Sequence, residues 1–261
     1  MNTKRFNAIL MYRDLLLAWT WRTVRVRYQQ SFLGGFWAVI QPAAAVAIFS
    51  IVFTRFIKVD TGGVPYVLFS FATMVPWTFF STSLTDMINS LVENMGLVTK
   101  IYFPREILPL SVMLARLLDF GIATGVLLVL MLYYRVPLFE PAWLYIPLIL
   151  LIQIGLVLGL GLMGAALNVF YRDIKHLIIL GLQIWLYASP VIYPVSVVPE
   201  RLRSLYFVNP MAGVVEAYRR VLIHAQAPDG HLLWSAFLAL AVLTFGFWFF
   251  KRVESQFADV L

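Results

Sequence analysis

The chain has 261 residues, of which 61% are hydrophobic and 13% are charged, and its mean hydropathy is +0.84. Because an ordinary soluble domain has about 25% charged residues, this composition excludes a soluble protein and predicts a polytopic membrane protein. The formal net charge is +7, but the cations flank apolar runs as in positive-inside topology, so nucleic acid is not an expected partner. The absence of cysteine from the sequence excludes disulfides, thiolate metal sites and cysteine nucleophiles.

The first predicted element is an amphipathic helix within residues 1–31. In the stretch WTWRTVRVRY, residues 19–28, arginines alternate with apolar and aromatic residues. A helix through them would carry cations on one side and apolar groups on the other, and such a helix lies along a membrane surface. No small-residue cleavage site follows a short apolar region, so a removable signal peptide is not expected and the N-terminus is predicted to stay in the cytosol.

Six apolar stretches follow, each about as long as a bilayer core requires, roughly 20 residues. They cover residues 33–56, 66–92, 107–134, 143–170, 174–193 and 232–250. The predicted fold is therefore an all-α integral membrane protein with six transmembrane helices in a single domain, 1–261. Lysine and arginine are more frequent in the connections on one side, with an incomplete asymmetry, and this distribution predicts that both termini are cytoplasmic.

The segment 195–228, before the last span, does not resemble a simple loop. It mixes prolines and apolar residues with charges at helical spacing, which predicts short helices on the outer side. From these residues alone, a re-entrant or interfacial pair of helices and an ordinary extracellular loop with a surface helix are about equally good interpretations. Glu216 and Arg220, four residues apart, are predicted to pair along one helix face.

Motifs of catalysis are missing from the sequence. It contains no HExxH, GxSxG or Walker loop, and its three histidines are not spaced as metal ligands, so no catalytic residue and no metal site are predicted. Charged residues at membrane depth are costly and often mark a pathway. For Arg116 and Asp119, three residues apart, we expect an intrahelical ion pair near the cytosolic end; Asp86 either lines a pore or lies at the cytosolic end of its span.

Aromatic residues recur on the predicted faces of spans one and two and in span five. One interpretation is packing or lipid contact, as in the interfacial belts of many membrane proteins. The other is a channel in which sugar rings stack on aromatic side chains while their hydroxyl groups bind polar residues. The candidate channel residues are Phe49, Phe53, Phe56, Tyr66, Phe69, Trp77, Phe80, Trp185 and Tyr193.

Three sets of motifs, taken in chain order, resemble the permease subunits of type-2 ABC exporters for bacterial polysaccharides. The first is RYQQSFLG at residues 27–34, the second is PWTFF at 76–80 with FPRE at 103–106, and the third is NVFYRDI at 168–174 with SPVIYP at 189–194. The resemblance covers essentially the whole chain, with six spans. Each motif alone would be weak, and their order carries the assignment.

The resemblance implies a permease that is not an enzyme and that forms a homodimer bound to two copies of a separate ATPase. That ATPase would bind ATP and Mg, so no cofactor is expected in this chain. The implied substrate is a lipid-linked glycan on an undecaprenyl-type carrier, O-antigen-like, in the bacterial cytoplasmic (inner) membrane. Teichoic-acid or capsule export are alternatives within the family, and a drug-efflux permease or a membrane glycosyltransferase are alternatives outside it.

The resemblance also implies sites. The connection 94–104 would be a coupling helix that docks on the ATPase, with candidate contacts Asn94, Met95, Gly96, Leu97, Lys100, Phe103, Pro104 and Arg105. The N-terminal helix would be a gate helix, and the family's aromatic-lined channel favours that interpretation of the rings. We further expect the diphosphate head group of the carrier to meet Arg22, Arg25 and Arg27 next to Tyr28; attraction of these arginines to anionic membrane lipids is an equally good alternative.

Overall fold

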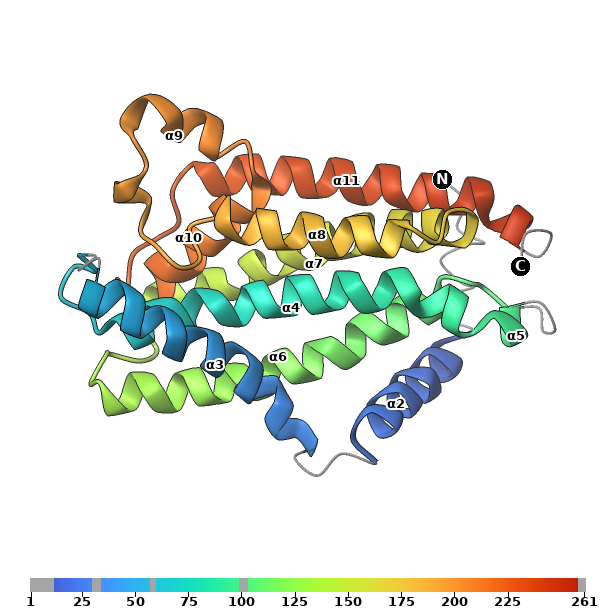
Figure 1. Cartoon of the computed structure of the whole chain (residues 1–261), viewed down its shortest axis with the longest axis horizontal. Helices are drawn as coiled ribbons and strands as arrows, with labels where there is room; N and C mark the ends of the chain where they lie inside the picture. The colour runs from blue at the N-terminus through green and yellow to red at the C-terminus, as the bar shows by residue number, and fades with distance from the viewer. Residues whose placement is uncertain (1–11, 30–33, 57–59, 99–102, 258–261) are drawn as a thin grey trace.

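The computed structural model describes residues 12–29, 34–56, 60–98 and 103–257, and these residues form one helical bundle without strands (Figure 1). Most of the long helices run side by side along the longest axis of the molecule. The elements used below are α2 (Arg13–Gln29), η1 (Gly34–Phe36), α3 (Trp37–Ile51), η2 (Val52–Phe56), α4 (Tyr66–Glu93), α5 (Met95–Val98), α6 (Ile107–Tyr133), η3 (Pro141–Tyr145), α7 (Ile146–Phe170), α8 (Ile174–Tyr187), η4 (Val195–Val197), α9 (Glu200–Tyr206), α10 (Pro210–Leu222), α11 (His231–Val253) and η5 (Glu254–Gln256).

Five helical stretches in the described residues are long and apolar enough to cross a membrane. They are Gly34–Arg55, Tyr66–Glu93, Ile107–Tyr133, Pro141–Phe170 and His231–Gln256, and each coincides with a predicted span. The remaining predicted span, 174–193, contains the 14-residue helix α8. The prediction of a continuous helix to Tyr193 is wrong: the helix ends at Tyr187 and the chain turns before Pro190 and Pro194, which have no amide hydrogen for a helical bond.

Helix α4 is the centre of the bundle, and α3, α6, α7, α8 and α10 all pack against it. Two buried amides on α7 bind its backbone: Gln153 Nε2 donates to the carbonyl of Pro76 at 2.7 Å, and Asn168 Nδ2 donates to the carbonyl of Ile88 at 3.0 Å. In an apolar surrounding, such interhelical hydrogen bonds hold helices in register. The central helix is therefore fixed to α7 at two levels.

Small residues bring α7 and α11 together, and this pair makes the most extensive helix–helix contact of the bundle. A Cβ atom built on Gly159 would lie 2.5 Å from the carbonyl group of Val242. Gly246 in turn faces the backbone of Gly159. Close backbone approach at small residues is a common way for membrane helices to associate, because lipid gives no hydrophobic drive for it.

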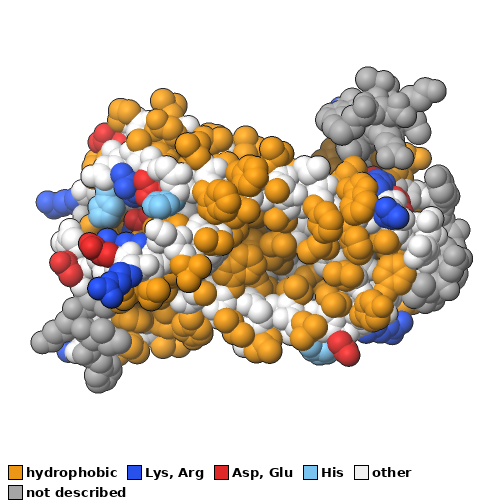
Figure 2. Space-filling model, turned by 90° about the horizontal axis from the view of Figure 1, so that it is seen from above, with side chains coloured by type: hydrophobic (Ala, Val, Ile, Leu, Met, Phe, Trp, Pro, Cys, Tyr) orange, Lys and Arg blue, Asp and Glu red, His pale blue; other side chains and the backbone are white. Residues whose placement is uncertain are grey.

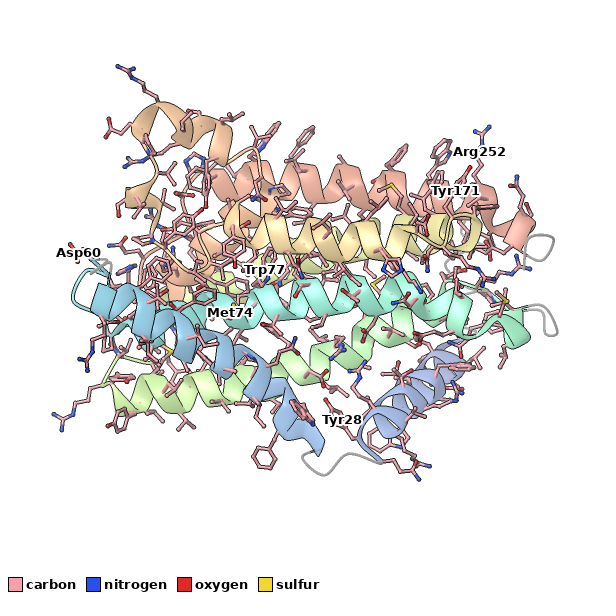
Figure 3. All side chains as sticks on the ribbon, viewed as in Figure 1. Tyr28, Asp60, Met74, Trp77, Tyr171 and Arg252 are labelled. Atoms are coloured by element: carbon pink, nitrogen blue, oxygen red, sulfur yellow. The ribbon has the colours of Figure 1, made fainter. Side chains whose placement is uncertain are left out.

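The connections separate into two ends of the bundle. Helices α2 and α5 and the C-terminal part of α11 lie at one end, here called the α2–α5 end, and α9 and α10 lie at the other, here called the α9–α10 end (Figure 1). Figure 2 shows hydrophobic side chains over the middle of one face, with charged side chains toward the two ends. Tyr171 and Arg252 lie at the α2–α5 end and Asp60 at the opposite end (Figure 3). This distribution fits several membrane crossings.

The segment before the last span contains a buried helix. Helix α10 packs against α4, α7 and α11, and most of its residues are buried, so it is not a surface helix on a loop. The predicted pairing of Glu216 with Arg220 is wrong. Glu216 binds Arg219 at 2.8 Å, whereas Arg220 turns to the carbonyl of Ala227 at 3.1 Å and to Asp229 at 3.8 Å. The inward side of α10 therefore holds a charge that spacing alone did not reveal.

Candidate functional site

Helix α2 packs on the bundle with a face that differs from the predicted one. Nine residues at helical spacing are partly covered: Tyr12, Leu15, Leu16, Trp19, Thr20, Thr23, Val24, Arg27 and Tyr28. Arg27 thus lies on the packed side, whereas Trp21 is 61% exposed and Val26 is 65% exposed. The expected separation of cations from apolar groups is wrong, because α6 takes up one stripe and leaves a mixed apolar and cationic surface outside. Such a mixed surface suits the headgroup region of a membrane.

The C-terminal end of α2 joins a cluster of ionisable side chains, here called the charge cluster, made of Arg27, Tyr28, Asp86, Arg116 and Asp119. Arg27 lies 2.8 Å from Asp119 and 3.0 Å from Asp86. Arg116 lies 2.7 Å from Asp86 and 3.1 Å from Asp119. The phenol of Tyr28 donates to the second carboxylate oxygen of Asp119. Each aspartate is therefore shared by two arginines from different helices.

The charge cluster answers two questions left by the sequence. The predicted intrahelical pair of Arg116 with Asp119 is confirmed. Asp86 is bound by Arg27 from α2 and Arg116 from α6, and its side chain is 29% exposed, so in this structure it is a bridge between helices. The sequence did not reveal the role of Arg27, since its partners lie 59 and 92 residues away along the chain.

A cavity of about 120 Å³ adjoins the charge cluster where α2, α3, α4 and α6 meet. Its polar wall includes Gln41, Thr78 and Thr82 beside Arg27 and Tyr28, and Figure 3 labels Tyr28 in the last turn of α2. Burial raises the pKa of Tyr28 to about 12, and its hydrogen bond to Asp119 acts in the same direction. The phenol therefore stays protonated and remains a donor at physiological pH.

The other two arginines of the predicted head-group site have different surroundings. Arg22 and Arg25 are exposed, and the guanidinium of Arg22 lies 4.4 Å from the ring centre of Trp19. Arg27 is 21% exposed and bound by two carboxylates. The three arginines thus do not form one patch: Arg22 and Arg25 face outward, and Arg27 faces the bundle.

The predicted coupling segment is only partly helical. Helix α5 covers Met95–Val98, shorter than the range 94–104, and Lys100 lies outside the described residues. Asn94 ends α4 and donates to the carbonyl of Ser90 at 2.8 Å. Gly96 is exposed and Leu97 is half-buried. Within the described part of this segment, α5 offers a partner a small exposed surface at Gly96.

Residues 103–106, at the end of the predicted coupling segment and just after it, lie beside the C-terminal end of α11 and η5. Phe103 is buried and Pro104 is half-buried, while the guanidinium of Arg105 donates to the carbonyl of Glu254. Next to it, Lys251 binds Glu106 at 2.6 Å and Glu254 at 2.8 Å. The charge of Arg105, predicted to face the ATPase, is thus used within the chain.

The candidate channel aromatics form two contacting rows. Phe49, Phe53, Tyr66 and Phe69 follow one another with ring centres 5.6–6.2 Å apart, and Trp77, Phe80 and Trp185 are 5.6 and 5.2 Å apart. Four of these side chains are at most 7% exposed, namely Tyr66, Phe69, Trp77 and Phe80. The side chain of Phe56 lies outside the described part of the chain. In this conformation the α4 aromatics pack inside the bundle. The partly exposed members of the candidate channel set are Phe49, Phe53, Trp185 and Tyr193.

Polar groups fix the turn that follows α8. Tyr66 and Thr73 of α4 donate to the carbonyls of Ile192 and Val191, both at 2.6 Å. Arg219 of α10 donates to the carbonyl of Pro190 and lies 4.0 Å from the ring centre of Phe69. Arg219 is 1% exposed. Its role was missed in the sequence, where a buried arginine on a short helix has no signature.

Asn209 connects three elements at the same end. Its side-chain oxygen accepts from Trp185 Nε1 at 2.7 Å and from the amide of Met211 at 3.0 Å, which caps α10. Its amide nitrogen donates to Ser189 Oγ at 2.8 Å.

Between α8 and α9, a groove of about 770 Å³ is lined by Trp185, Tyr193 and Tyr206. Burial raises the pKa of Tyr206, and its contact with the Tyr193 hydroxyl at 2.9 Å raises this pKa further.

Replacing Asn209 by alanine is expected to lower stability by about 1–2 kcal/mol, because α10 loses its cap and the Trp185 N–H loses its partner. Thermal unfolding in detergent measures the loss. Asn89→Ala is the matched control, since among the described residues the amide of Asn89 binds only the carbonyl of Thr85 in its own helix. Equal losses in the two variants would contradict the role given to Asn209.

Among the described residues, no group of three or more His, Asp or Glu side chains could hold a metal ion. The site consists instead of ionic bridges, stacked rings and an aromatic groove.

Comparison with known proteins agrees with the membrane architecture. The profile of the ABC-2 type transporter family matches residues 14–223. An O-antigen export system permease protein, RfbA, of Myxococcus xanthus is 30% identical over 256 residues, which covers 96% of each chain. A protein of the same name from Klebsiella pneumoniae is 27% identical, with 95% of each chain covered. The polysialic acid transport protein KpsM of Escherichia coli is 23% identical over 89% of this chain and 91% of that one.

Proposed function

Because the chain belongs to the ABC-2 type transporter family, whose members are multi-pass membrane proteins, we propose that it is the permease of an ATP-driven polysaccharide exporter. The proposed substrate is an O-antigen-like glycan linked to an undecaprenyl-type lipid. The observation that carries this proposal is similarity over 96% of both chains to an O-antigen export permease. A separate ATPase, in two copies, would hydrolyse ATP with Mg, and this chain would supply the membrane path.

The proposed topology has six crossings in the bacterial inner membrane. Helix α8 would be the fifth crossing in chain order and would bring the total to six. Its 14 residues rise about 21 Å, and the fixed turn 188–194 would complete the crossing. The α2–α5 end would face the cytosol, with both termini there, and α9 and α10 would lie on the outer side. This orientation is supported by Arg105, Arg172, Lys175, Lys251 and Arg252 in the connections that would be cytosolic.

The aromatic groove supports a path for sugar rings. Trp185, Tyr193 and Tyr206 line an open groove next to the buried α4 aromatics. Such side chains would contact a sugar over a broad surface without binding it tightly at any one residue. The exposed apolar residues Ile48 and Ile51 on α3 and Leu180 and Ile184 on α8 would face a second copy. In the homodimer, the two grooves would then line one channel.

The test is purification together with the ATPase partner. The proposal expects a complex of two permeases and two ATPases in which a lipid-linked glycan stimulates ATP hydrolysis. Vesicles containing the complex should move that glycan only with ATP. Purification of the chain alone with robust solute flux would overturn the proposal. Comparison of O-antigen, capsule and teichoic-acid carriers in the same vesicles identifies the polymer, and the similarity to KpsM makes a capsule-type polymer the second candidate.

Capture of the diphosphate head group is proposed for the exposed arginines of α2. Arg22→Gln/Arg25→Gln is expected to lower export roughly tenfold, because two charge-assisted hydrogen bonds to phosphate would be lost. Export into vesicles measures the effect at constant amounts of assembled complex. Arg13→Gln is the matched control, since Arg13 is an exposed arginine on the same helix and pairs with Asp14 at 3.4 Å. If the double variant exported like the control, Arg22 and Arg25 would have no head-group role.

A further inference from the structure

The charge cluster determines which helices α2 is attached to. Arg27 and Tyr28, in the last turn of α2, contact Asp86 on α4 and Asp119 on α6. Leu15, Leu16 and Trp19, further back along α2, also pack against the core, and α2 makes far more contacts with α6 than with η1. In the described residues, α2 thus packs mainly against α6, and its ionic contacts also reach α4.

Separation of these groups is unfavourable. The side chains of Arg27 and Arg116 are each 21% exposed and that of Asp119 is 11% exposed, so water screens their attraction only partly. Pulling Arg27 away would leave Asp119 and Asp86 with Arg116 as the one arginine that they share in the charge cluster. Breaking one partner out of a largely buried ionic group leaves an uncompensated charge, which is strongly destabilising.

The described residues that lead into α3, Gly34 and Gly35, have the opposite character. Gly34 has a φ of +49°, a left-handed conformation that favours glycine, and Gly35 follows it. Two successive glycines allow a change of direction at low cost. Helix α3 also packs against α4 and α6, but it carries no charged side chain. Turning α3 at Gly34 and Gly35 therefore breaks no ion pair of α3, whereas moving α2 breaks the charge cluster.

Helix α5 lies at the junction of the same two helices, since it follows α4 and precedes α6 in the chain (Figure 1). We infer that Asp86 and Asp119 are positioning residues that lock α2 to α4 and α6, so that these helices move as one unit and α3 turns against them at Gly34 and Gly35. This inference rests on the proposed function for the source of the movement. A push on α5 then reaches α2 through the charge cluster without passing through α3.

Distances between spin labels test whether α2 and α6 move together, and the measurement needs no glycan. The sequence has no cysteine, so Leu17→Cys/Leu118→Cys labels only α2 and α6, and Leu17→Cys/Ile48→Cys labels only α2 and α3; all three side chains are at least 50% exposed. In the complex with the ATPase, addition of a non-hydrolysable ATP analogue should leave the α2–α6 distance unchanged and shift the α2–α3 distance. A shift of the α2–α6 distance with a constant α2–α3 distance, or equal shifts in both, would overturn the inference. So would two constant distances.

A variant of the cluster gives a second readout. Asp119→Asn in the α2–α6 labelled background should broaden the distance distribution, because Arg27 and Tyr28 lose a charged partner. Ser111→Ala is the matched control on α6, since the hydroxyl of Ser111 binds the carbonyl of Leu108 in its own helix and no other group in the described part of the chain. An unchanged distribution in Asp119→Asn would show that packing alone positions α2.

Chemical cross-linking tests whether the contact between Arg27 and Asp119 transmits movement or only helps the chain to fold. Arg27→Cys/Asp119→Cys is expected to assemble with the ATPase but to export roughly tenfold less per ATP hydrolysed, the size of a typical coupling energy. Joining the two thiols with a short bifunctional reagent should restore export per ATP, and Arg27→Cys alone with the same reagent should not recover. A joined variant that hydrolyses ATP without export would overturn the inference, since the joint would then have to open. If no variant, including the wild type, exports glycan, the proposed function fails while the label distances still decide the inference.

Discussion

Arg219→Met is expected to destabilise the protein by about 3–5 kcal/mol, the usual cost of removing one member of a buried ion pair. The side chain of Arg219 is 2% exposed, and its guanidinium lies 2.8 Å from Glu216, whose side chain is 17% exposed. Without it, the Glu216 carboxylate and the carbonyl of Pro190 lose their partner. The turn after α8 would then lose one of the contacts that fix it to α10.

Thermal unfolding of the purified protein in detergent checks this expectation. Arg220→Met is the matched control: Arg220 is the next residue, 33% exposed, and its partner Asp229 lies 3.8 Å away, so its loss should cost about 1 kcal/mol or less. Arg219→Met/Glu216→Gln should be more stable than Arg219→Met, because the unpaired carboxylate is removed as well. A single variant as stable as the control would mean that Arg219 contributes no net stability.

Gly159→Leu is expected to have the other large effect, loss of the packed α7–α11 pair. Overpacking an ordinary core site costs about 1–3 kcal/mol and occasionally more, and here the added side chain would meet the backbone of Val242, which has no rotamer to adopt. The helices would have to separate along their most extensive contact. We therefore expect a cost at or above the upper end of this range.

Yield of monodisperse protein and its unfolding temperature measure that effect. Gly125→Leu provides the matched control, since Gly125 is also inside a membrane helix but a Cβ atom there would meet no atom within 4 Å. Glycine-to-leucine changes at both sites gain helix propensity equally. A Gly159→Leu protein that unfolds at the temperature of Gly125→Leu would show that α7 and α11 tolerate a wider spacing.

The sequence was most informative where apolar runs are long. The second predicted span, 66–92, agrees with α4 at Tyr66–Glu93, because composition and length alone define a helix that must satisfy its own backbone in lipid. The fifth span was too long, since the prolines after Tyr187 sit in an otherwise apolar run that hydropathy treats as continuous. Local hydrogen bonding at residues 188–194, which hydropathy does not report, ends that helix.

The charge cluster and the fixed turn could not be predicted in the same way. Arg27 looked like one of three similar surface cations, and only the packing of α2 on α6 distinguishes it from Arg22 and Arg25. Arg219 was passed over in favour of its neighbour Arg220, since a spacing of three or four residues brings either side chain to Glu216. In both cases a contact far away in the sequence decides the position of the side chain: Asp119 for Arg27 and the carbonyl of Pro190 for Arg219.

The composition of the charge cluster has an electrical consequence. Arg27 and Arg116 carry two positive charges, Asp86 and Asp119 carry two negative charges, and Tyr28 is neutral below its raised pKa. A membrane potential acts on net charge with about 2.3 kcal/mol per elementary charge per 100 mV. Moving the cluster as a whole transfers no net charge across the field, whereas moving Arg27 alone would transfer one. The charge cluster thus adds no net charge to a joint displacement of α2, α4 and α6, so a membrane potential does no work on the cluster itself.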